Sequence, residues 1–188
     1  MIEKPVFKFA LRSDVKGDKR FIPTRSESKA SGWDVTAAPL DRQPIVIKPF
    51  EHVKIPLGFR AFCPDGWWFE LKPRSSTFAK KNLHSLYGTI DELYEGQLIF
   101  ACQYIPSLKI LPEVKTYADK NNHTHICGMF DASIYKTLTI QFGEPIGQII
   151  PVKRQEMEVI DISNDEYDYL CAERKGERGK KGFGEMGG

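Results

Sequence analysis

Residues 88–96 read Gly-Thr-Ile-Asp-Glu-Leu-Tyr-Glu-Gly, which places one carboxylate and one aromatic ring between two glycines. We predict that this stretch forms the tip of a β-hairpin, with Ile90 and Leu93 turned inward and with Asp91 and Tyr94 free to meet a ligand. Glycine permits close approach because it has no Cβ atom. An Asp in a turn more commonly only shapes the turn. The stretch alone therefore leaves a binding pocket and a plain turn both open.

Four further short motifs surround this stretch in a fixed order. Residues 30–38 (Ala-Ser-Gly-Trp-Asp-Val-Thr-Ala-Ala) and 73–77 (Pro-Arg-Ser-Ser-Thr) precede it, and residues 143–148 (Gly-Glu-Pro-Ile-Gly-Gln) and 178–184 (Arg-Gly-Lys-Lys-Gly-Phe-Gly) follow it. Each motif is weak alone, but the ordered set is hard to obtain by chance. Together they resemble the ordered motifs of the trimeric dUTPases (deoxyuridine 5'-triphosphate nucleotidohydrolases), over about residues 32–187.

Composition is that of an ordinary soluble domain. The chain has 188 residues, 28% charged and 41% hydrophobic, with a formal net charge of +2. A chain of this length is expected to form one domain. Its net charge is too small to indicate binding to a polyanion, so no nucleic-acid partner is expected. We see neither a signal peptide at the N-terminus nor a stretch that could span a bilayer, and we expect a cytoplasmic protein, or one in the host cytoplasm if the gene is viral. The four cysteines are widely spaced and are expected to be reduced.

The period-two patterning of short apolar runs predicts an all-β fold, a β-sandwich or jelly roll. The predicted strands are 6–11, 33–38, 45–47, 52–55, 58–63, 67–71, 97–104, 136–142 and 147–152, with one short helix or turn in 75–84. The resemblance implies a dUTPase-like β domain over 1–152. Residues 153–188 form a polar linker and a glycine-rich lid, a flexible C-terminal arm that is either disordered or ordered by a ligand.

Residues 105–131 are predicted to be an insertion, because the resemblance implies only a short excursion there. Long excursions are commonly functional or disordered, and this one offers a surface for a protein partner. It contains His123, His125 and Cys127, which on a strand would share one face and could bind a metal, although a fourth ligand would be needed. An exposed polar face with a packed cysteine is the alternative.

The resemblance implies hydrolysis of dUTP to dUMP and pyrophosphate by attack of water at the α-phosphorus. Asp91 would orient and activate that water. Tyr94 would pack against the deoxyribose and leave no room for a 2'-hydroxyl. The backbone of residues 83–88 would bind the uracil edge, with Gly88 and Ile90 among the residues that contact the nucleotide.

Phosphate binding is implied for a second group of residues: Arg74, Ser75, Ser76 and Gln148. A guanidinium offers a planar fork to phosphate oxygens, and a serine hydroxyl can donate to them. A plain salt bridge for Arg74 and a polar strand position for Gln148 are the alternatives. Asp34 would support the site indirectly, near the waters of the metal or near the phosphate-binding arginine, or would act as a turn cap. The resemblance implies Mg²⁺ bound to the triphosphate and no direct protein ligand to it.

The C-terminal motif would supply a lid. Arg178 would reach the γ-phosphate, Phe183 would stack on the base, and Gly182 and Gly184 would let backbone amides approach the phosphates. The sequence departs from the family pattern at Lys181 and at residues 185–186, where Glu-Met replaces Ser-Thr. These departures bear on the affinity for the nucleotide more than on the type of reaction.

Two alternatives remain beside a dUTP-hydrolysing homotrimer whose sites lie between subunits. A dCTP deaminase relative would share the fold and a Ser-Ser pair, but it requires a glutamate shortly after the hairpin, and residues 97–101 supply none. A regulatory, protein-binding dUTPase-like module has little reason to retain Asp91, Tyr94 and Arg178 together. Both roles can coexist in one chain.

Overall fold

Alternation of buried and exposed side chains along the longest strands shows how the sequence builds two facing layers. The computed structural model describes residues 4–107, 115–118, 120, 124–127 and 135–174. In β6 (Trp67–Pro73), Phe69 and Leu71 are buried, while Glu70 and Lys72, which alternate with them, pair with each other on the other face. The strand β9 (Ile99–Tyr104) buries alternate residues in the same way. Both strands thus turn one apolar face inward.

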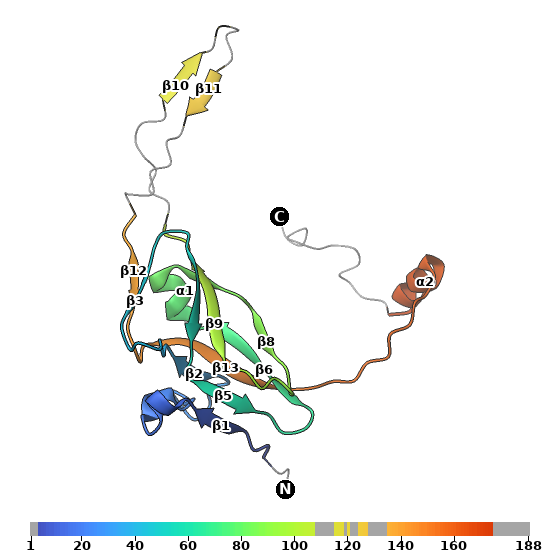
Figure 1. Ribbon diagram of the computed structural model, residues 1–188. Coiled ribbons are helices and arrows are strands. Elements are labelled where there is room, and N and C mark those ends of the chain that lie inside the picture. Colours follow the sequence, from blue (N-terminus) through green and yellow to red (C-terminus); the bar gives the residue numbers. More distant parts are fainter. Residues whose placement is uncertain (1–3, 108–114, 119, 121–123, 128–134, 175–188) are drawn as a thin grey trace. The chain divides into compact units, whose positions relative to one another are not determined.

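The remaining strands extend these layers (Figure 1). A sheet with the order β2-β13-β6-β8 faces a sheet with the order β4-β9-β7, and the pairs β1-β5, β3-β12 and β10-β11 complete the strand pairing. The bounds are β1 (Lys8–Leu11), β2 (Trp33–Thr36), β3 (Ile45–Ile47), β4 (His52–Pro56), β5 (Phe59–Phe62), β7 (Leu83–Ser85), β8 (Gly88–Ile90), β10 (Lys115–Ala118), β11 (Thr124–Cys127), β12 (Leu138–Ile140) and β13 (Pro145–Lys153).

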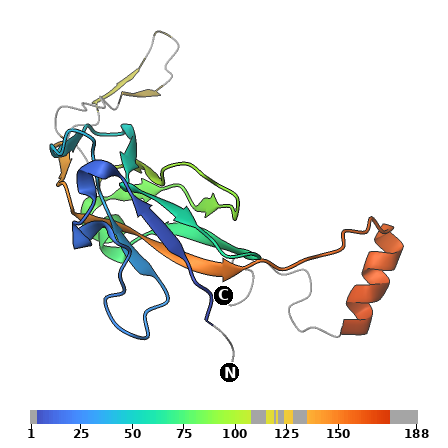
Figure 2. The ribbon, with the colours of Figure 1, turned by 60° about the horizontal axis from the view of Figure 1, so that its bottom comes forward.

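One hydrophobic core lies between the layers. Phe69 of β6, Phe100 of β9 and Ile149 of β13 are each at most 2% exposed and belong to one cluster. The strand β1 crosses the four-stranded layer (Figure 2). Phe7, just before β1, and Phe9, within it, pack on the Phe69 ring at centroid distances of 5.0 and 6.1 Å. Burial of large side chains is the main stabilising contribution here. The all-β sandwich predicted from the sequence is confirmed, and every predicted strand is present.

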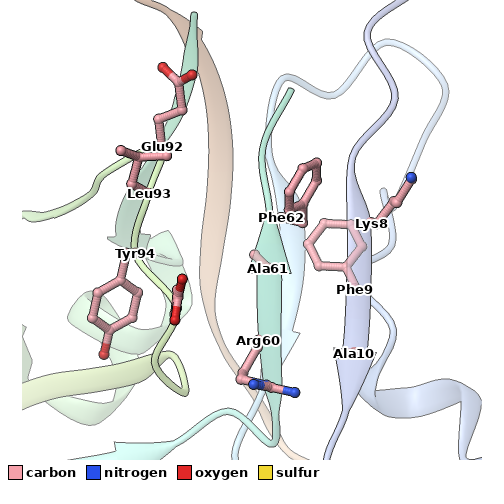
Figure 3. Close-up of a pocket in the computed structure, with 10 residues that line it drawn as sticks. Lys8, Phe9, Ala10, Arg60, Ala61, Phe62, Glu92, Leu93 and Tyr94 are labelled. Atoms are coloured by element: carbon pink, nitrogen blue, oxygen red, sulfur yellow. The ribbon is translucent and has the colours of Figure 1, made fainter. Parts of the chain in front are cut away.

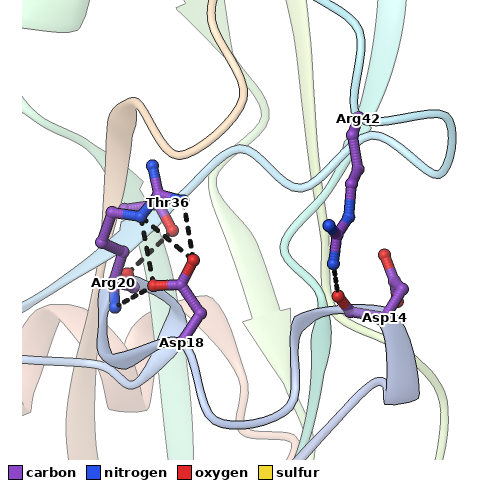
Figure 4. A network of polar contacts seen from close by, with 5 residues as sticks. All are labelled: Asp14, Asp18, Arg20, Thr36 and Arg42. Carbon is purple, nitrogen blue, oxygen red and sulfur yellow. Dashed lines mark hydrogen bonds and ion pairs between the residues drawn. The ribbon is translucent and has the colours of Figure 1, made fainter.

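Two one-turn helices, η1 (Ser13–Val15) and η2 (Lys19–Phe21), are held by arginine side chains that contact Asp14 and Asp18, and Figure 4 shows the contacts of Arg20 and Arg42. Arg12 donates to Asp14 Oδ2 at 2.7 Å and to the Ala38 carbonyl at 2.9 Å. Arg20 pairs with Asp18 at 2.7 Å, and Arg42 donates to the Asp14 carbonyl. These contacts join the N-terminal segment to the chain that follows β2.

The hydrogen bond from Arg12 is the largest cause of the lowered pKa of Asp14. A carboxyl group whose pKa is lowered by folding stabilises the folded state above its unfolded pKa, about 3.9, and that contribution is lost as the pH falls through the folded value. We expect the melting temperature to decline below a pH of about 4, and the decline to be shallower in Asp14→Asn. Thermal unfolding measured from pH 2 to 6 checks this. Identical slopes in the two proteins would contradict it.

The predicted hairpin at residues 88–96 is wrong. The strand β8 pairs with β6, whereas β7 just before it and β9 just after it pair with each other in the facing sheet. The segment therefore crosses from one sheet to the other. Leu93 is 87% exposed, which corrects its predicted inward direction, whereas Ile90 packs against the core.

The short helix predicted in 75–84 is present as α1 (Ser75–Lys81). The strands β10 and β11 lie within the predicted insertion and pair as an antiparallel hairpin, with Tyr117 opposite His125. Cys63, Cys102 and Cys171 are free, as expected. Burial raises the pKa of Cys102 to about 12, so this thiol stays protonated.

The chain divides into two compact units, Met1–Arg154 and Gln155–Gly188. The second unit contains the helix α2 (Asn164–Arg174), which lies within the predicted C-terminal arm. Asp165 and Glu166 in the first turn complement the helix dipole, and Ser163 Oγ accepts from the Glu166 amide at 3.1 Å as an N-terminal cap. No helix among the described residues is long and apolar enough to cross a membrane.

Candidate active site

Three of the predicted site residues meet at one carboxylate. Asp34 on β2 and Gln148 on β13 lie directly opposite each other in the ladder. Gln148 Nε2 donates to Asp34 Oδ1 at 3.0 Å, and Arg74 Nε lies 3.3 Å from the same oxygen. Asp34 is 17% exposed and Arg74 is 32% exposed. The aspartate thus orients an amide and a guanidinium that both remain open to solvent on one side.

The start of α1 is fixed to the strand that carries Gln148. Arg74 precedes the helix in an extended conformation and its amide donates to the Ile146 carbonyl at 3.4 Å. Thr77, 1% exposed, donates from its hydroxyl to the same carbonyl at 2.7 Å. Ser75 and Ser76 occupy the first turn beside Arg74. The four predicted phosphate-binding residues therefore come from β13 and from the junction of β6 with α1.

Gly32 lies against Gln148, a contact that was not predicted from the sequence. A Cβ atom at Gly32 would lie 3.1 Å from Gln148 Cβ, Cδ and Oε1. That distance is tighter than ordinary contact, so a side chain here would push Gln148 away from Asp34. The glycine in the first motif was the available signal, because a glycine beside a functional strand often marks close approach.

Asp91 and Tyr94 lie on the crossing segment after β8. The Asp91 carboxylate is exposed, and among the described residues it has no hydrogen-bond or ion-pair partner. The Tyr94 amide donates to the Asp91 carbonyl at 3.1 Å, and its hydroxyl donates to the Gln97 carbonyl at 3.2 Å. A Cβ atom at Gly96 would lie 2.3 Å from the Tyr94 hydroxyl oxygen. Gly96 is therefore the residue that lets the tyrosine ring fold back onto the segment.

Cavities flank this segment on two sides. One of about 370 Å³ lies between Tyr94 and Leu93 on one side and Phe62 of β5 and Lys8 of β1 on the other (Figure 3). A second cavity, of about 420 Å³, is lined by Trp68, Thr89, Asp91, Glu92, Leu93 and Arg154. Glu92 and Leu93 border both cavities. A cleft with one free carboxylate on its wall is a common setting for catalysis.

Two buried polar atoms near the crossing segment have no hydrogen-bond partner in the described part of the chain. They are Ser85 Oγ at the end of β7 and Gln97 Oε1 just before β9. Buried polar groups are normally paired, so such atoms often await a ligand or water. Ser85 lies in the backbone segment that was predicted to bind the base.

The cluster of Asp34, Arg74 and Gln148, which we call the Arg74 group, does not meet Asp91 within one chain. Ile90 lies opposite Phe69 near the start of β6, so Asp91 follows at that end, whereas Arg74 follows Pro73 at the other end. Asp91 falls opposite Trp68, and 74 − 68 = 6 residues separate that position from Arg74 along the strand, or about 20 Å at about 3.3 Å per residue. One chain therefore presents two half-sites at opposite ends of one strand.

Several predicted residues lie outside the described part of the chain. Arg178, Gly182, Phe183 and Gly184 of the lid, with Lys181, Glu185 and Met186, belong to the residues that are not described, as does His123. The side chains of His125 and Cys127 are likewise not described. Within the described residues, no three His, Cys, Asp or Glu side chains are grouped so that they could hold a metal ion.

Comparison with known proteins gives consistent matches, although no protein-family model matches the chain. The dUTPase of Aquifex aeolicus is 39% identical over 79 residues, 41% of this chain and 51% of that protein. The dUTPase of Fusobacterium nucleatum is 25% identical over 168 residues, 88% and 89% of the two chains. The match to the first of these relatives thus spans about half of its length.

Solved structures show the same fold. The dUTPase of Staphylococcus bacteriophage 80alpha, solved with dUpNHpp, superposes with a TM-score of 0.67 at 22% identity over 97% of this chain and 99% of that one. The dUTPase of phage phi11 of S. aureus, described with a species-specific insert, superposes with a TM-score of 0.61 at 21% identity over 85% and 97%. The fold is therefore that of the phage dUTPases. The sequence matches and the shared fold agree that the chain is similar to dUTPases.

Proposed function

We propose that the protein hydrolyses dUTP to dUMP and pyrophosphate. The observation that carries this proposal is the convergence of Arg74 and Gln148 on Asp34, because it holds two phosphate-binding groups in one orientation. The relatives named above are dUTPases, and one was solved with dUpNHpp, which supports a triphosphate substrate of the same class.

Asp91 would orient the attacking water. An ionised carboxylate only accepts hydrogen bonds, and this one is exposed beside a cavity without a competing partner in the described chain. It can therefore accept a proton from water as the oxygen attacks the α-phosphorus. Arg74 and Gln148 would bind the α-phosphate, and Arg178 and Phe183 would close over the nucleotide from the C-terminal lid. Closure of the lid would exclude bulk water while keeping the attacking water, and pyrophosphate would be released when the lid opens.

Mg²⁺ is proposed to arrive with the triphosphate. The described residues offer no group of three ligands, and the Asp34 carboxylate is already engaged by Arg74 and Gln148. This fits an ion held mainly by phosphate oxygens and waters, as Mg²⁺ commonly is. The ion would neutralise phosphate charge. A variant of the phage phi11 dUTPase was described with a structural Mg(II) ion, so magnesium occurs in this fold.

We also propose that a homotrimer completes the site. The half-sites lie about 20 Å apart along β6 within one chain, too far to act on one phosphorus. A second copy can bring its Asp91 segment to the Arg74 group of the first. Most soluble oligomers are symmetric assemblies of identical chains, so the same contact would complete every site.

A second role, binding of a protein partner through residues 105–131, has one observation in its favour. The segment contains the paired strands β10 and β11, and so holds secondary structure of its own. The phage 80alpha dUTPases are described as controlling transfer of virulence genes, which is a role beyond hydrolysis in the same fold.

The proposed activity is tested by pyrophosphate release from dUTP, dCTP, dTTP and UTP, each with Mg²⁺ and with excess chelator. We expect dUTP with Mg²⁺ to give the highest kcat/KM, and chelation to abolish release while leaving the melting temperature of the ligand-free protein unchanged. Equal rates with dCTP, or no release from dUTP, would contradict the proposal.

Tyr94→Ala should reduce discrimination between dUTP and UTP. If the ring packs on the deoxyribose, a 2'-hydroxyl must overlap it, and overpacking typically costs about 1–3 kcal/mol. Wild type should therefore prefer dUTP more than about tenfold, and the ratio of the two kcat/KM values should shrink in the variant. Tyr94→Phe keeps the ring and loses only the hydroxyl bond to Gln97, so it should keep the ratio. An unchanged ratio in Tyr94→Ala would show that the sugar is recognised elsewhere.

A further inference from the structure

The segment that carries Asp91 is tied to another strand by a single side-chain ion pair among the contacts described for it. Glu92 Oε2 lies 2.6 Å from Arg154 Nη1 at the end of β13. The other bonds of the segment, from the Tyr94 amide and hydroxyl, stay within residues 91–97. The direction of Asp91 relative to the sheet therefore depends on what holds its neighbour Glu92.

Arg154 is well placed to act as an anchor. It follows Lys153, which pairs with Trp67 in the ladder between β13 and β6. The Arg154 amide donates to the Gly66 carbonyl at 2.7 Å, just before β6 begins. Its backbone is thus fixed to the same strand that pairs with β8. The guanidinium spans from this rigid sheet to the crossing segment.

Glu92 is buried enough that its position depends on the ion pair with Arg154. Its side chain is only 18% exposed, whereas that of Arg154 is 55% exposed. Burial, and to a smaller extent the nearby Glu92 charge, raises the pKa of the Cys63 thiol to about 11. A mostly buried carboxylate that loses its cation tends to move toward solvent. Movement of Glu92 would carry the adjacent Asp91 with it.

We propose that Arg154 is a positioning residue, which through Glu92 fixes the segment 91–97 and so sets the direction of Asp91 toward the cavity that Asp91, Glu92 and Arg154 line together. This rests on the proposed function in one respect, the catalytic role of Asp91. Arg154 itself contacts no reacting atom in this scheme.

The test combines kinetics with a cycle of variants: Arg154→Ala, Glu92→Gln and the double variant. Misplacing a catalytic group by about 1 Å can cost up to about 100-fold in rate, so we expect Arg154→Ala to lower kcat for dUTP by about 10-fold or more with KM changed less than about threefold. If Arg154 acts through Glu92, the double variant should lose no more than the single variants do. If the loss of kcat in the double variant equals the product of the two single losses, the proposal is overturned.

Arg20→Ala is the matched control. Arg20 is 56% exposed and pairs with Asp18 at 2.7 Å, so it resembles Arg154 in exposure and in geometry but lies on η2. It should leave kcat unchanged. An equal loss of kcat in Arg20→Ala and Arg154→Ala would show that any lost surface pair has this effect and would overturn the positioning role.

A second measurement does not depend on activity. Amide hydrogen exchange in residues 91–97 should be at least about fivefold faster in Arg154→Ala than in wild type, because local opening becomes easier, and unchanged in Arg20→Ala. If wild type fails to hydrolyse dUTP, the proposed function fails, while faster exchange would still support the anchor. Unchanged exchange overturns the anchor whatever the activity, and faster exchange with unchanged kcat overturns its link to Asp91.

Discussion

Asp91→Asn is expected to fold and to bind nucleotide but to lose turnover by about 10²- to 10⁴-fold, the usual contribution of a positioned general base. The amide keeps the size of the side chain but cannot take a proton from water. Because Asp91 is exposed and makes no ion pair or hydrogen bond within the described chain, its replacement removes no structural contact. The melting temperature should therefore stay within the error of the measurement.

Three measurements decide this prediction: kcat for dUTP, the affinity for the non-hydrolysable analogue dUpNHpp, and the melting temperature. Glu95→Gln is a suitable control, since Glu95 is an exposed carboxylate on the same segment. It should retain full activity. Normal turnover in Asp91→Asn would remove Asp91 from the mechanism, and a large loss of analogue affinity would point to a binding role instead.

Arg74→Ala is expected to lower kcat/KM for dUTP by about 10²- to 10³-fold, comparable to the loss of one preorganised donor to a developing negative charge. Arg74→Lys should recover little of this, because an ammonium group lacks the planar fork of a guanidinium. Asp34→Asn should show a smaller loss, since the amide no longer holds Arg74 and Gln148 by charge although both remain present. Equal activity of Arg74→Ala and wild type would remove this cluster from the site.

The two variants together test whether different chains supply the two halves of the site. Asp91→Asn and Arg74→Ala should each be nearly inactive alone. When the two are unfolded together and refolded as a mixture, about a quarter of the sites in a symmetric assembly would receive Asp91 and Arg74 from intact segments. Recovered activity near that fraction is the expected result. A mixture as inactive as its components would show that both residues must come from one chain.

Local patterning made much of the fold predictable. Period-two alternation of β-branched and aromatic residues marks strands such as β6 and β9 without reference to the rest of the chain, because each needs one buried face. The helix α1 follows Pro73 and is equally local in origin. The helix α2 was missed, because its exposed polar residues carry no apolar periodicity, and only its serine cap and acidic first turn indicate a start.

In the candidate site, too, some features could be predicted from local sequence and others could not. The order of the motifs, with Asp91, Arg74 and Gln148 in them, can be read from the chain. Strand pairing cannot be read in this way, because a sequence shows which residues suit a strand and not which strand lies beside it. The crossing of residues 88–96 between sheets, which the hairpin prediction missed, is a case of this kind.

The all-β class, the strand segments and the family resemblance could be predicted from the chain alone, because they rest on local propensity and on the order of residue types. Three features exist only in the folded chain: Asp34 holds Arg74 and Gln148, Glu92 is joined to Arg154, and Asp91 lies at the far end of β6 from Arg74. Arg154 and Glu92 are 62 positions apart, and Gln148 and Asp34 are 114 apart. Such contacts arise from sheet register, which the packing of the whole core selects and no local pattern encodes.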